Sequence, residues 1–334
     1  MLFDGGTPDT WPVLRARLLA LDAAEREIDI AVISHIDSDH IGGMLPLLGD
    51  SDLGVRFGDV WFNGLAQLPE QENGTSRSVA EGESVVRLLS GAGEMRLPWN
   101  RAFDGRAAMT AGDGRIRRLQ RQTGPELTLL SPTPRRLRAL RNLWATELGR
   151  MRRGEPAEPA PGPQAPARLE DLETLAATPT ARDASIANGS SIALLLEHQG
   201  VRCLLAADAW ASVLGAALTA AINDRGGERL ELDLFKLSHH GSKGNVTSKL
   251  LGLVPARQYV VSTNGERFHH PDDVALARVV TSAPAGATIC FNYASASAER
   301  WSHPDLRKRY EFQVVCPAKS DGFGARLELD SRSA

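Results

Sequence analysis

The chain has 334 residues, of which 42% are hydrophobic, so it is long enough for one large domain with insertions or for two domains. Its 38 basic and 41 acidic residues give a formal net charge of −3, so the overall charge does not indicate binding to nucleic acid or to a membrane surface. The sequence shows no signal-peptide pattern and no uninterrupted apolar run near the ~18–20 residues of a membrane span, so we expect a cytoplasmic protein without a membrane segment.

Helices and strands are expected to alternate in the first 64 residues. Residues 10–25 predict a helix, and residues 28–34, "IDIAVIS", predict a buried strand because the run is rich in Ile and Val and too short for a typical helix. A second helix is expected to begin near Ile41, and residues 58–64, "GDVWFNG", predict a second strand. This alternation is typical of an α/β layered architecture.

Residues 80–181 interrupt the alternation with an arginine-rich helix and a proline-rich segment. Apolar residues recur at helical spacing in "RRLRALRNLWATELGRMRR", namely at Leu137, Leu140, Trp144 and Leu148. Seven arginines between positions 135 and 153 occupy the other faces, and we interpret them as a solvated surface. The alternative is a surface that contacts phosphates, because guanidinium groups match phosphate oxygens. Residues 155–167 contain five prolines and predict a mobile or polyproline-like connector.

Strands and helices alternate again after the connector. Residues 190–210, "SSIALLLEHQGVRCLLAADAW", predict a β-hairpin because two apolar runs flank "EHQG". The remaining elements are expected at 211–223 (helix), 232–238 and 258–263 (strands), 274–280 (helix), and 286–293 and 312–318 (closing strands). Polar residues follow several of these strands at their carboxyl ends, where open α/β sheets collect ligand sites.

The cysteines and the isolated histidines form no recognisable site. Cys203, Cys290 and Cys316 are widely spaced and odd in number, which fits neither a disulfide framework nor a C-x-x-C metal site. We expect them to be small buried hydrophobic residues. His198 and His303 are expected to be ordinary surface residues.

A cluster of metal-ligand residue types follows the first predicted strand. His35, Asp37, Asp39 and His40 form an H-x-D-x-D-H pattern within six residues, just before two glycines. Divalent metals bind imidazole nitrogen and carboxylate oxygen, and clustered carboxylates need a counter-charge that a metal supplies. The alternative is a hydrogen-bonded polar turn, but four such side chains at the end of a buried strand favour a metal site.

Three further positions carry residue types that suit such a site. Asp208 ends an apolar run, where a carboxylate is costly if it is buried without a partner, although an aspartate there is often the N-cap of the following helix. His239 and His240 follow another predicted strand, and because adjacent side chains point to different sides, one can bind metal while the other orients a substrate or a carboxylate. His269 and His270 repeat the pair in a loop before a helix.

The order of these motifs resembles the metallo-β-lactamase fold, and specifically the branch like the cytoplasmic domain of the competence protein ComEC. The matching segments are "SHIDSDHIGG", "NGSSIALLLEHQGVRCLLAADAW", "FKLSHHGSKGN" and "STNGERFHHPDD", within roughly residues 1–74 and 186–280. The resemblance implies a single domain over residues 1–334 of the α/β class. It would form a four-layered αβ/βα sandwich that carries a binuclear metal centre, with residues 80–181 as an insertion.

The resemblance also implies six metal ligands, which are His35, Asp37, Asp39, His40, Asp208 and His239. The first two would serve one metal and the next two the other, while Asp208 would bridge both metals and His239 would complete the second set. The first metal lacks a further histidine, because the hairpin offers only "NGSS" at residues 188–191. With an aspartate at position 37, where many relatives have histidine, this oxygen-rich set shifts the expected metal from zinc toward manganese or a mixed occupancy.

The same resemblance suggests how such a centre would act. Two metals can lower the pKa of a bridging water and neutralise charge on a leaving group. Asp39 would be both a ligand and an orienter of the nucleophile, and His240 or His270 would protonate the leaving oxygen. His270 is preferred to its neighbour because a histidine directly before proline matches the family-like pattern. The residues expected to contact a substrate anion are Ser242, Lys243 and His269.

The leading interpretation is a metal-dependent phosphodiesterase that acts as a nuclease on DNA or RNA, because the branch it resembles does this and the middle segment offers arginines. The same centre could instead hydrolyse a small ester, lactone or thioester, or the chain could be a sensor or interaction module on a hydrolase scaffold. An arginine surface facing the metals would favour nucleic acid, whereas an apolar lid would favour a small ester.

The start of the chain departs from the fold that it resembles. That fold opens with a strand hairpin before the Asp-Gly-Gly segment, whereas "LFDGG" begins here at Leu2. Either this edge is missing, or a partner protein or a second copy in a homo-oligomer supplies it, or the start is wrongly assigned.

Overall fold

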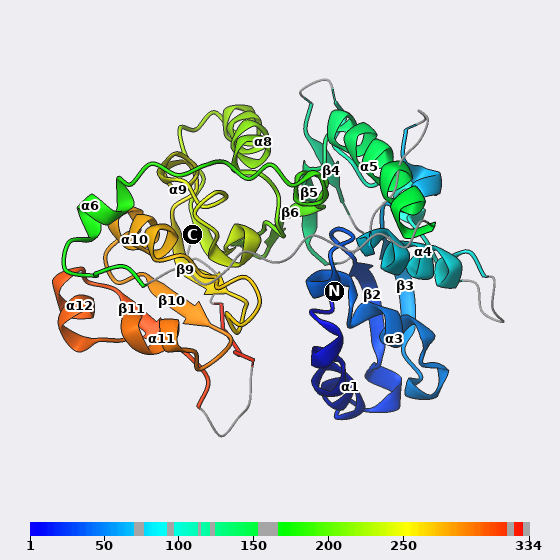
Figure 1. Ribbon diagram of the computed structural model, residues 1–334, viewed down its shortest axis with the longest axis horizontal. Helices are drawn as coiled ribbons and strands as arrows, with labels where there is room; N and C mark the ends of the chain where they lie inside the picture. The colour runs from blue at the N-terminus through cyan, green and yellow to red at the C-terminus, as the bar shows by residue number, and fades with distance from the viewer. Residues whose placement is uncertain are drawn as a thin grey trace. The chain divides into compact units, whose positions relative to one another are not determined.

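The computed structural model describes residues 1–69, 77–91, 97–112, 115–120, 124–152, 166–318 and 324–329, and for 77–81 and 145–152 it describes the backbone alone. The chain divides into two compact units, which are drawn in Figure 1. Unit 1 comprises Met1–Gly112, Pro132–Glu158 and Ser185–Ile192. Unit 2 comprises Asp113–Ser131, Pro159–Ala184 and Ala193–Ala334.

Unit 1 is built on a parallel sheet with the strand order β1-β2-β3. The strands are β1 (Leu2–Phe3), β2 (Glu27–Val32) and β3 (Arg56–Trp61). The helices are α1 (Trp11–Leu19), α2 (Ser38–Ile41), α3 (Met44–Gly49), α4 (Arg77–Leu89), α5 (Pro134–Arg152) and α7 (Ile186–Gly189). Short 3-10 helices lie at Pro8–Thr10, Ala23–Glu25, Ser51–Leu53, Leu65–Gln67 and Arg101–Phe103.

The arginine-rich helix α5 packs on α4 and α7 through its apolar face. Leu137, Leu140 and Trp144 are at most 2% exposed and belong to the core of unit 1, which confirms the helical spacing expected there. Trp144 Nε1 also donates a hydrogen bond to Glu83 Oε1 of α4 (2.8 Å). The amphipathic interpretation is therefore confirmed for this part of the helix.

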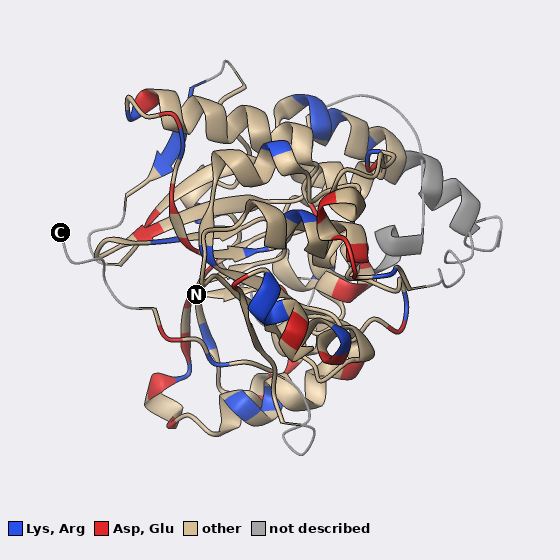
Figure 2. Ribbon diagram, turned by 90° about the vertical axis from the view of Figure 1, so that its left-hand side faces the viewer, with Lys and Arg blue, Asp and Glu red and all other residues tan. Residues whose placement is uncertain are grey.

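Only some of the arginines of α5 have described side chains. Arg141 donates hydrogen bonds to the carbonyl groups of Leu65 and Leu68 (3.1 and 2.8 Å), so it fastens a loop of unit 1. Basic and acidic residues are interspersed along the ribbon in Figure 2. The side chain of Leu148 and the arginines that follow it lie outside the described residues, as do residues 155–165 of the expected connector. The phosphate-contacting surface stays a prediction.

Unit 2 is built on a larger sheet with the strand order β11-β10-β9-β8-β7-β6-β5-β4. The strands are β4 (Arg117–Leu119), β5 (Glu126–Ser131), β6 (Ala193–His198), β7 (Val201–Leu205), β8 (Leu232–Lys236), β9 (Ala256–Val261), β10 (Thr288–Phe291) and β11 (Gln313–Val315). The helices are α6 (Leu172–Ala176), α8 (Ala211–Asp224), α9 (Ser248–Leu253), α10 (Asp273–Ser282), α11 (Ala296–Trp301) and α12 (Pro304–Arg309). Strands β7 to β11 are parallel, and the pairs from β4 to β7 are antiparallel.

The β6-β7 pair is the hairpin that the sequence predicts. His198 lies opposite Val201, so Gln199 and Gly200 alone form the turn. Both turn residues have positive φ (49° and 79°), which matches the right-handed twist of the flanking strands. The pairing with β6 extends to Leu205, the last residue of β7, so the hairpin determines where the following residues leave the sheet.

Helices cover the sheet of unit 2 and share one apolar core with it. Leu204, Phe235 and Tyr259, from adjacent strands, are fully buried in this core with residues of α8, α9 and α10. Helix α9 contacts both α8 and α10, as Figure 1 shows. Strands and helices thus form layers in each unit, and the predicted α/β class is confirmed.

The segment expected as an insertion, residues 80–181, contributes elements to both units. Helix α5 belongs to unit 1, whereas β4 and β5 are strands of the sheet of unit 2. Polar and apolar residues alternate in β5 only from Glu126 to Leu129, and five of its six residues are buried, so the pattern is too short to mark the strand in the sequence.

The cysteines differ in burial. Cys203 and Cys290 are buried, as expected, but Cys316 is exposed, so the prediction that all three are buried is wrong for that residue. Cys316 directly follows β11, the edge strand of its sheet. Among the described residues, none of the helices combines the length and apolar character that a membrane span requires.

Candidate metal centre

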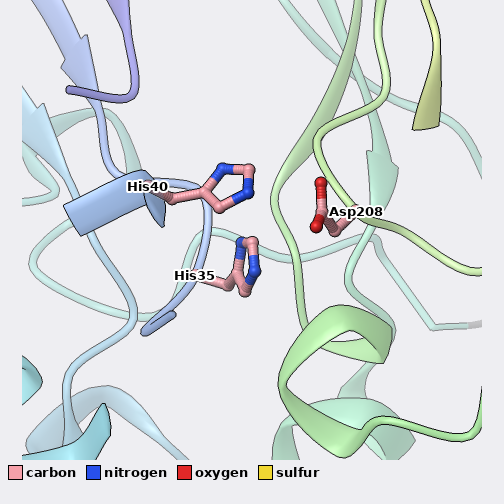
Figure 3. A group of neighbouring side chains, drawn as sticks. All are labelled: His35, His40 and Asp208. Carbon is pink, nitrogen blue, oxygen red and sulfur yellow. The ribbon is translucent and has the colours of Figure 1, made fainter. Parts of the chain in front are cut away.

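The H-x-D-x-D-H motif lies where β2 of unit 1 leaves the sheet. The strand pairs end at Val32, and the backbone N–H of Ile33 still donates to the Trp61 carbonyl (2.9 Å). Asp37 then precedes α2, in which His40 lies. The rings of His35 and His40 come together, as Figure 3 shows, and their centroids are 4.2 Å apart.

Asp4 supports this histidine pair from the Asp-Gly-Gly segment at the end of β1. Its carboxylate accepts hydrogen bonds from the Ser34 backbone N–H (2.7 Å) and hydroxyl group (2.8 Å), and lies 2.8 Å from His40 Nδ1. Burial raises the pKa of Asp4, but the charge and hydrogen bond of His40 outweigh it and hold the pKa below its usual value. The sequence analysis missed Asp4, although "DGG" marks the turn that brings it here.

His35 is the buried side chain whose bonding is incomplete. Its Nδ1 lies 2.9 Å from the Ser34 hydroxyl oxygen, and its side chain is fully buried. Nε2 has no hydrogen-bond partner in the described part of the chain, although it lies 3.5 Å from Asp37 Oδ2. A buried polar nitrogen without such a partner is costly, and a metal ion beside the Asp37 carboxylate would satisfy it.

The two aspartates of the motif are more accessible than its histidines. The Asp37 side chain is 33% exposed, and Asp39 lies in the first turn of α2 with intermediate exposure. His35 and His40 are both 3% exposed. The four motif residues therefore offer buried nitrogen and accessible oxygen donors within a single strand-loop-helix turn.

Asp208 follows β7 in unit 2 and is 2% exposed; it is also labelled in Figure 3. It is not the N-cap of α8, because that helix begins after Trp210. Its Oδ2 lies 3.7 Å from Nε2 of His239 and 3.7 Å from Nε2 of His240, and Lys236 Nζ lies 3.9 Å from its Oδ1. The buried carboxylate is thus surrounded by nitrogen atoms.

His239 and His240 both approach Asp208, so the prediction that they point to different sides is wrong. Their backbones are left-handed (φ 47° and 54°), which turns successive side chains away from the alternation of a strand. His240 Nδ1 donates to the Ser262 carbonyl (2.6 Å), so its lone pair is on Nε2 when the ring is neutral. Ser262, at the end of β9, was missed by the sequence analysis.

The surroundings of His239 are acidic. Its Nδ1 lies 3.2 Å from Asn245 Oδ1 and 3.4 Å from Asp183 Oδ2, two residues that the sequence analysis also missed. Burial lowers the pKa of His239, but Asp183 and Asp208 outweigh burial and raise it to about 9. A metal ion that binds Nε2 would have to displace a proton from this ring.

The loop of His269 and His270 lies against that of His239. The rings of His270 and His239 meet edge to face with centroids 4.9 Å apart, whereas His269 is exposed and has a left-handed backbone. Gly241 allows this contact, because a Cβ atom there would lie 2.7 Å from the Pro271 side chain. The His270–Pro271 peptide bond is cis.

Asp272 connects the two loops. It accepts a hydrogen bond from the Lys243 backbone N–H (2.8 Å), and its carboxylate lies 3.4 Å from Lys243 Nζ and 3.5 Å from His270 Nδ1. Burial raises the pKa of Asp272, but these contacts outweigh it and lower the pKa. Ser242 is 8% exposed, and its hydroxyl oxygen accepts from the Gly244 N–H (3.3 Å).

Residues 188–191 of unit 1 form the end of α7 and the turn after it. The Ser185 hydroxyl accepts from the Asn188 N–H (3.3 Å) and so begins this short helix. Ser191 is fully buried. The absence of a histidine from this turn was read from the sequence, and its effect on the first metal stays a prediction.

Two comparisons with known proteins bear on these residues. Residues 1–62, which include the whole H-x-D-x-D-H motif, match the family model described as the metallo-beta-lactamase superfamily. "ComE operon protein 3" of Bacillus subtilis (strain 168) is 26% identical to this chain over 110 residues. The aligned part is 33% of this chain and 13% of the relative, so the chain spans well under two thirds of that protein's length. The resemblance inferred from the motifs is confirmed, and the two sheets with their helices are consistent with the fold that it implies.

Proposed function

We infer that this chain, a ComEC-like protein of the metallo-β-lactamase superfamily and thus a metal-dependent hydrolase, is a phosphodiesterase that cleaves nucleic acid. The observation that carries this inference is the buried histidine pair of unit 1, in which Asp4 holds His40 at Nδ1 while His35 Nε2 has no hydrogen-bond partner in the described part of the chain. An imidazole held at Nδ1 presents the Nε2 lone pair to a metal. The phosphodiester substrate is proposed from the ComEC-type motifs.

We propose two divalent ions, zinc or manganese, as cofactors. Their proposed ligands are His35, Asp37, Asp39, His40, Asp208 and His239. These nitrogen and oxygen donors suit both metals, and the aspartate at position 37 favours manganese at the first position. Such ions lower the pKa of water and neutralise charge on a phosphoryl group.

The remaining roles fall to side chains around these donors. Asp39 would accept a hydrogen bond from the attacking water and orient it. His270 would give a proton from Nε2 to the leaving oxygen, because its Nδ1 lies 3.5 Å from Asp272 Oδ2, and this contact orients the ring. His240 is the alternative proton donor, although its Nδ1 is already bound to the Ser262 carbonyl.

Ser242, Lys243 and His269 are proposed to contact the phosphate. Lys243 Nζ lies 3.4 Å from the Asp272 carboxylate, and its side chain is 31% exposed. The ammonium group would therefore be accessible to a phosphate, which it would bind through charge-assisted hydrogen bonds. His269 is exposed on the neighbouring loop. Both residues would bind the backbone of a nucleic acid rather than its bases.

The test is cleavage of single- and double-stranded DNA and RNA by the purified chain, first stripped with a chelator and then supplied with Mn²⁺ or Zn²⁺. We expect cleavage only with added metal, and a loss of ~100-fold or more in the Asp39→Ala and His40→Ala variants. His303→Ala is the matched control, because His303 is 65% exposed and lies outside the proposed centre.

Equal cleavage by Asp39→Ala and the unsubstituted chain would contradict the proposal, as would metal-independent cleavage. If the chain cleaves none of the four polymers but hydrolyses a model ester, lactone or thioester in a metal-dependent way, the small-ester function replaces it. Metal binding without hydrolysis of either class would support the sensor or interaction module.

A further inference from the structure

Residues 176–183 of unit 2, here called the strap, run alongside the loop of residues 238–247. Arg278 of α10 joins the two and is 6% exposed. All five N–H groups of its guanidinium donate hydrogen bonds, and the acceptors are Ala176 O (3.1 Å), Thr178 O (2.8 Å), Thr180 Oγ1 (3.1 Å), Lys243 O (2.8 Å) and Val246 O (3.0 Å). These five hydrogen bonds hold the strap and the loop together rigidly, because moving either segment away from Arg278 would break several of them at once.

The strap touches the loop directly as well. The Thr180 hydroxyl donates to the Lys243 carbonyl (3.0 Å). A Cβ atom at Gly244 would lie 3.1 Å from the Asp183 backbone nitrogen and 3.2 Å from the Ala181 carbonyl oxygen, so the two segments are in close contact there. The hydrogen bond of Thr180 and the close contacts at Gly244 therefore fix the position of Asp183 relative to the loop.

Asp183 and Asn245 form a brace around His239. Asp183 Oδ2 accepts a hydrogen bond from Asn245 Nδ2 (2.9 Å) and lies 3.4 Å from His239 Nδ1. Asn245 Nδ2 also faces the Asp208 carbonyl oxygen (3.2 Å), which turns its Oδ1 toward His239 Nδ1 (3.2 Å). Asn245 is fully buried, and the Asp183 side chain is 8% exposed.

The brace lies beside a strained backbone. His239 has φ 47° and ψ 53°, a left-handed conformation that is unfavourable for a residue with a Cβ atom. The oxygen atoms of Asp183 and Asn245 face Nδ1, and on the other side of the ring Nε2 lies 3.7 Å from Asp208 Oδ2. Loss of the contacts at Nδ1 would leave the ring free to turn away from Asp208.

We propose that Asp183 and Asn245 are positioning residues for the metal ligand His239, and that the strap sets the metal affinity of the position to which His239 belongs. The proposal rests on the metal-dependent function proposed above. It assigns a role to the segment just before α7, which the sequence motifs do not cover.

The test is metal binding by the full chain, measured on chelator-treated protein by calorimetric titration with Zn²⁺ and by the visible absorption of bound Co²⁺. Asp183→Asn keeps the size of the side chain and removes its charge, and Asn245→Asp keeps Oδ1 and removes the donor. We expect each variant to bind one of the two ions about 10- to 100-fold more weakly than the unsubstituted chain and to change the Co²⁺ spectrum. Asp305→Asn, at a side chain that is 92% exposed, is the matched control.

Metal binding by the unsubstituted chain tests the proposed function, whereas the comparison of the variants with that chain tests the role of Asp183 and Asn245. If the unsubstituted chain binds no metal, the proposed function and this inference both fail. If it binds two ions and both variants bind them with unchanged affinity and spectrum, only this inference is overturned. Thermal unfolding of the metal-free forms identifies a variant that does not fold, and the other variant then decides the outcome.

Discussion

At the scale of single residues, a buried carboxylate of this protein can accept hydrogen bonds from both near and distant parts of the chain. Asp59 of β3 shows the pattern, since it accepts hydrogen bonds from Trp61 Nε1 (2.8 Å) and from the backbone N–H groups of Arg101 and Ala102 (both 2.9 Å). The His35 Nε2 atom is one of nine buried side-chain atoms that lack a hydrogen-bond partner among the described residues. It lies 3.5 Å from the Asp37 carboxylate within the motif, and this neighbour supports the proposed metal-binding role.

The cysteines give a prediction at this scale. Burial raises the pKa of Cys203 to about 11 and that of Cys290 to about 11, so both remain thiols at pH 8, whereas Cys316 is exposed. Because the thiolate is the reactive form, iodoacetamide at pH 8 should modify Cys316 alone in the folded chain. Mass spectrometry of the intact protein should show one added group, and three in denaturant. Rapid modification of Cys203 or Cys290 in the folded chain would contradict the burial described here.

At the scale of elements, two glycines bring the end of β1 against the start of α3. A Cβ atom at Gly43 would lie 2.1 Å from the Gly5 carbonyl oxygen, and one at Gly5 would lie 2.4 Å from the Met44 nitrogen. The Gly5 N–H donates to the His40 carbonyl (2.9 Å) across this contact. The close approach of the two segments is what lets Asp4 reach His40.

Replacing Gly43 by alanine should therefore destabilise unit 1. We expect Gly43→Ala to cost about 1–3 kcal/mol, because the new methyl group displaces backbone rather than a flexible side chain. Gly49→Ala, at the other end of α3, is the control, since a Cβ atom there meets nothing within 4 Å. It should be neutral or stabilise the chain by up to about 1 kcal/mol. Urea unfolding midpoints of the two variants measure the difference, and equal midpoints would refute this account of the contact.

At the scale of the whole molecule, metal binding by the proposed ligands would be coupled to folding, because a formed site rarely exists in the unfolded chain. Ions that bind only the folded chain stabilise it by mass action, and the gain is about 2.7 kcal/mol at a metal concentration of 100 times Kd.

Removing the metal should therefore lower the thermal stability of the whole chain. From the size of this gain, we expect the Tm measured with excess Mn²⁺ or Zn²⁺ to fall by roughly 4 °C for each bound ion on addition of a chelator. The His35→Ala variant should show a smaller fall, because it lacks one donor. A Tm that is the same with metal and with chelator would count against the proposed centre.

The sequence by itself determined the features that depend on short stretches of chain. The apolar run before Ser34, the hairpin turn at Gln199 and Gly200, and the spacing of Leu137 and Trp144 each follow from residues that are close in sequence. The same is true of the metal motif, because its four side chains lie within six residues of each other. Local propensity and periodicity are sufficient for such features.

Only the tertiary structure decided which residues hold the histidines in place. Asp4 and His40 are 36 residues apart, Asp183 and Asn245 are 62 apart, and His240 is 22 residues from the carbonyl group of Ser262 that it binds. A hydrogen bond requires two atoms to meet within about 3 Å, and no sequence pattern specifies that meeting when the chain between them folds through several elements. The donors could therefore be read from the sequence, whereas their orientation depends on the packing of strand ends and loops.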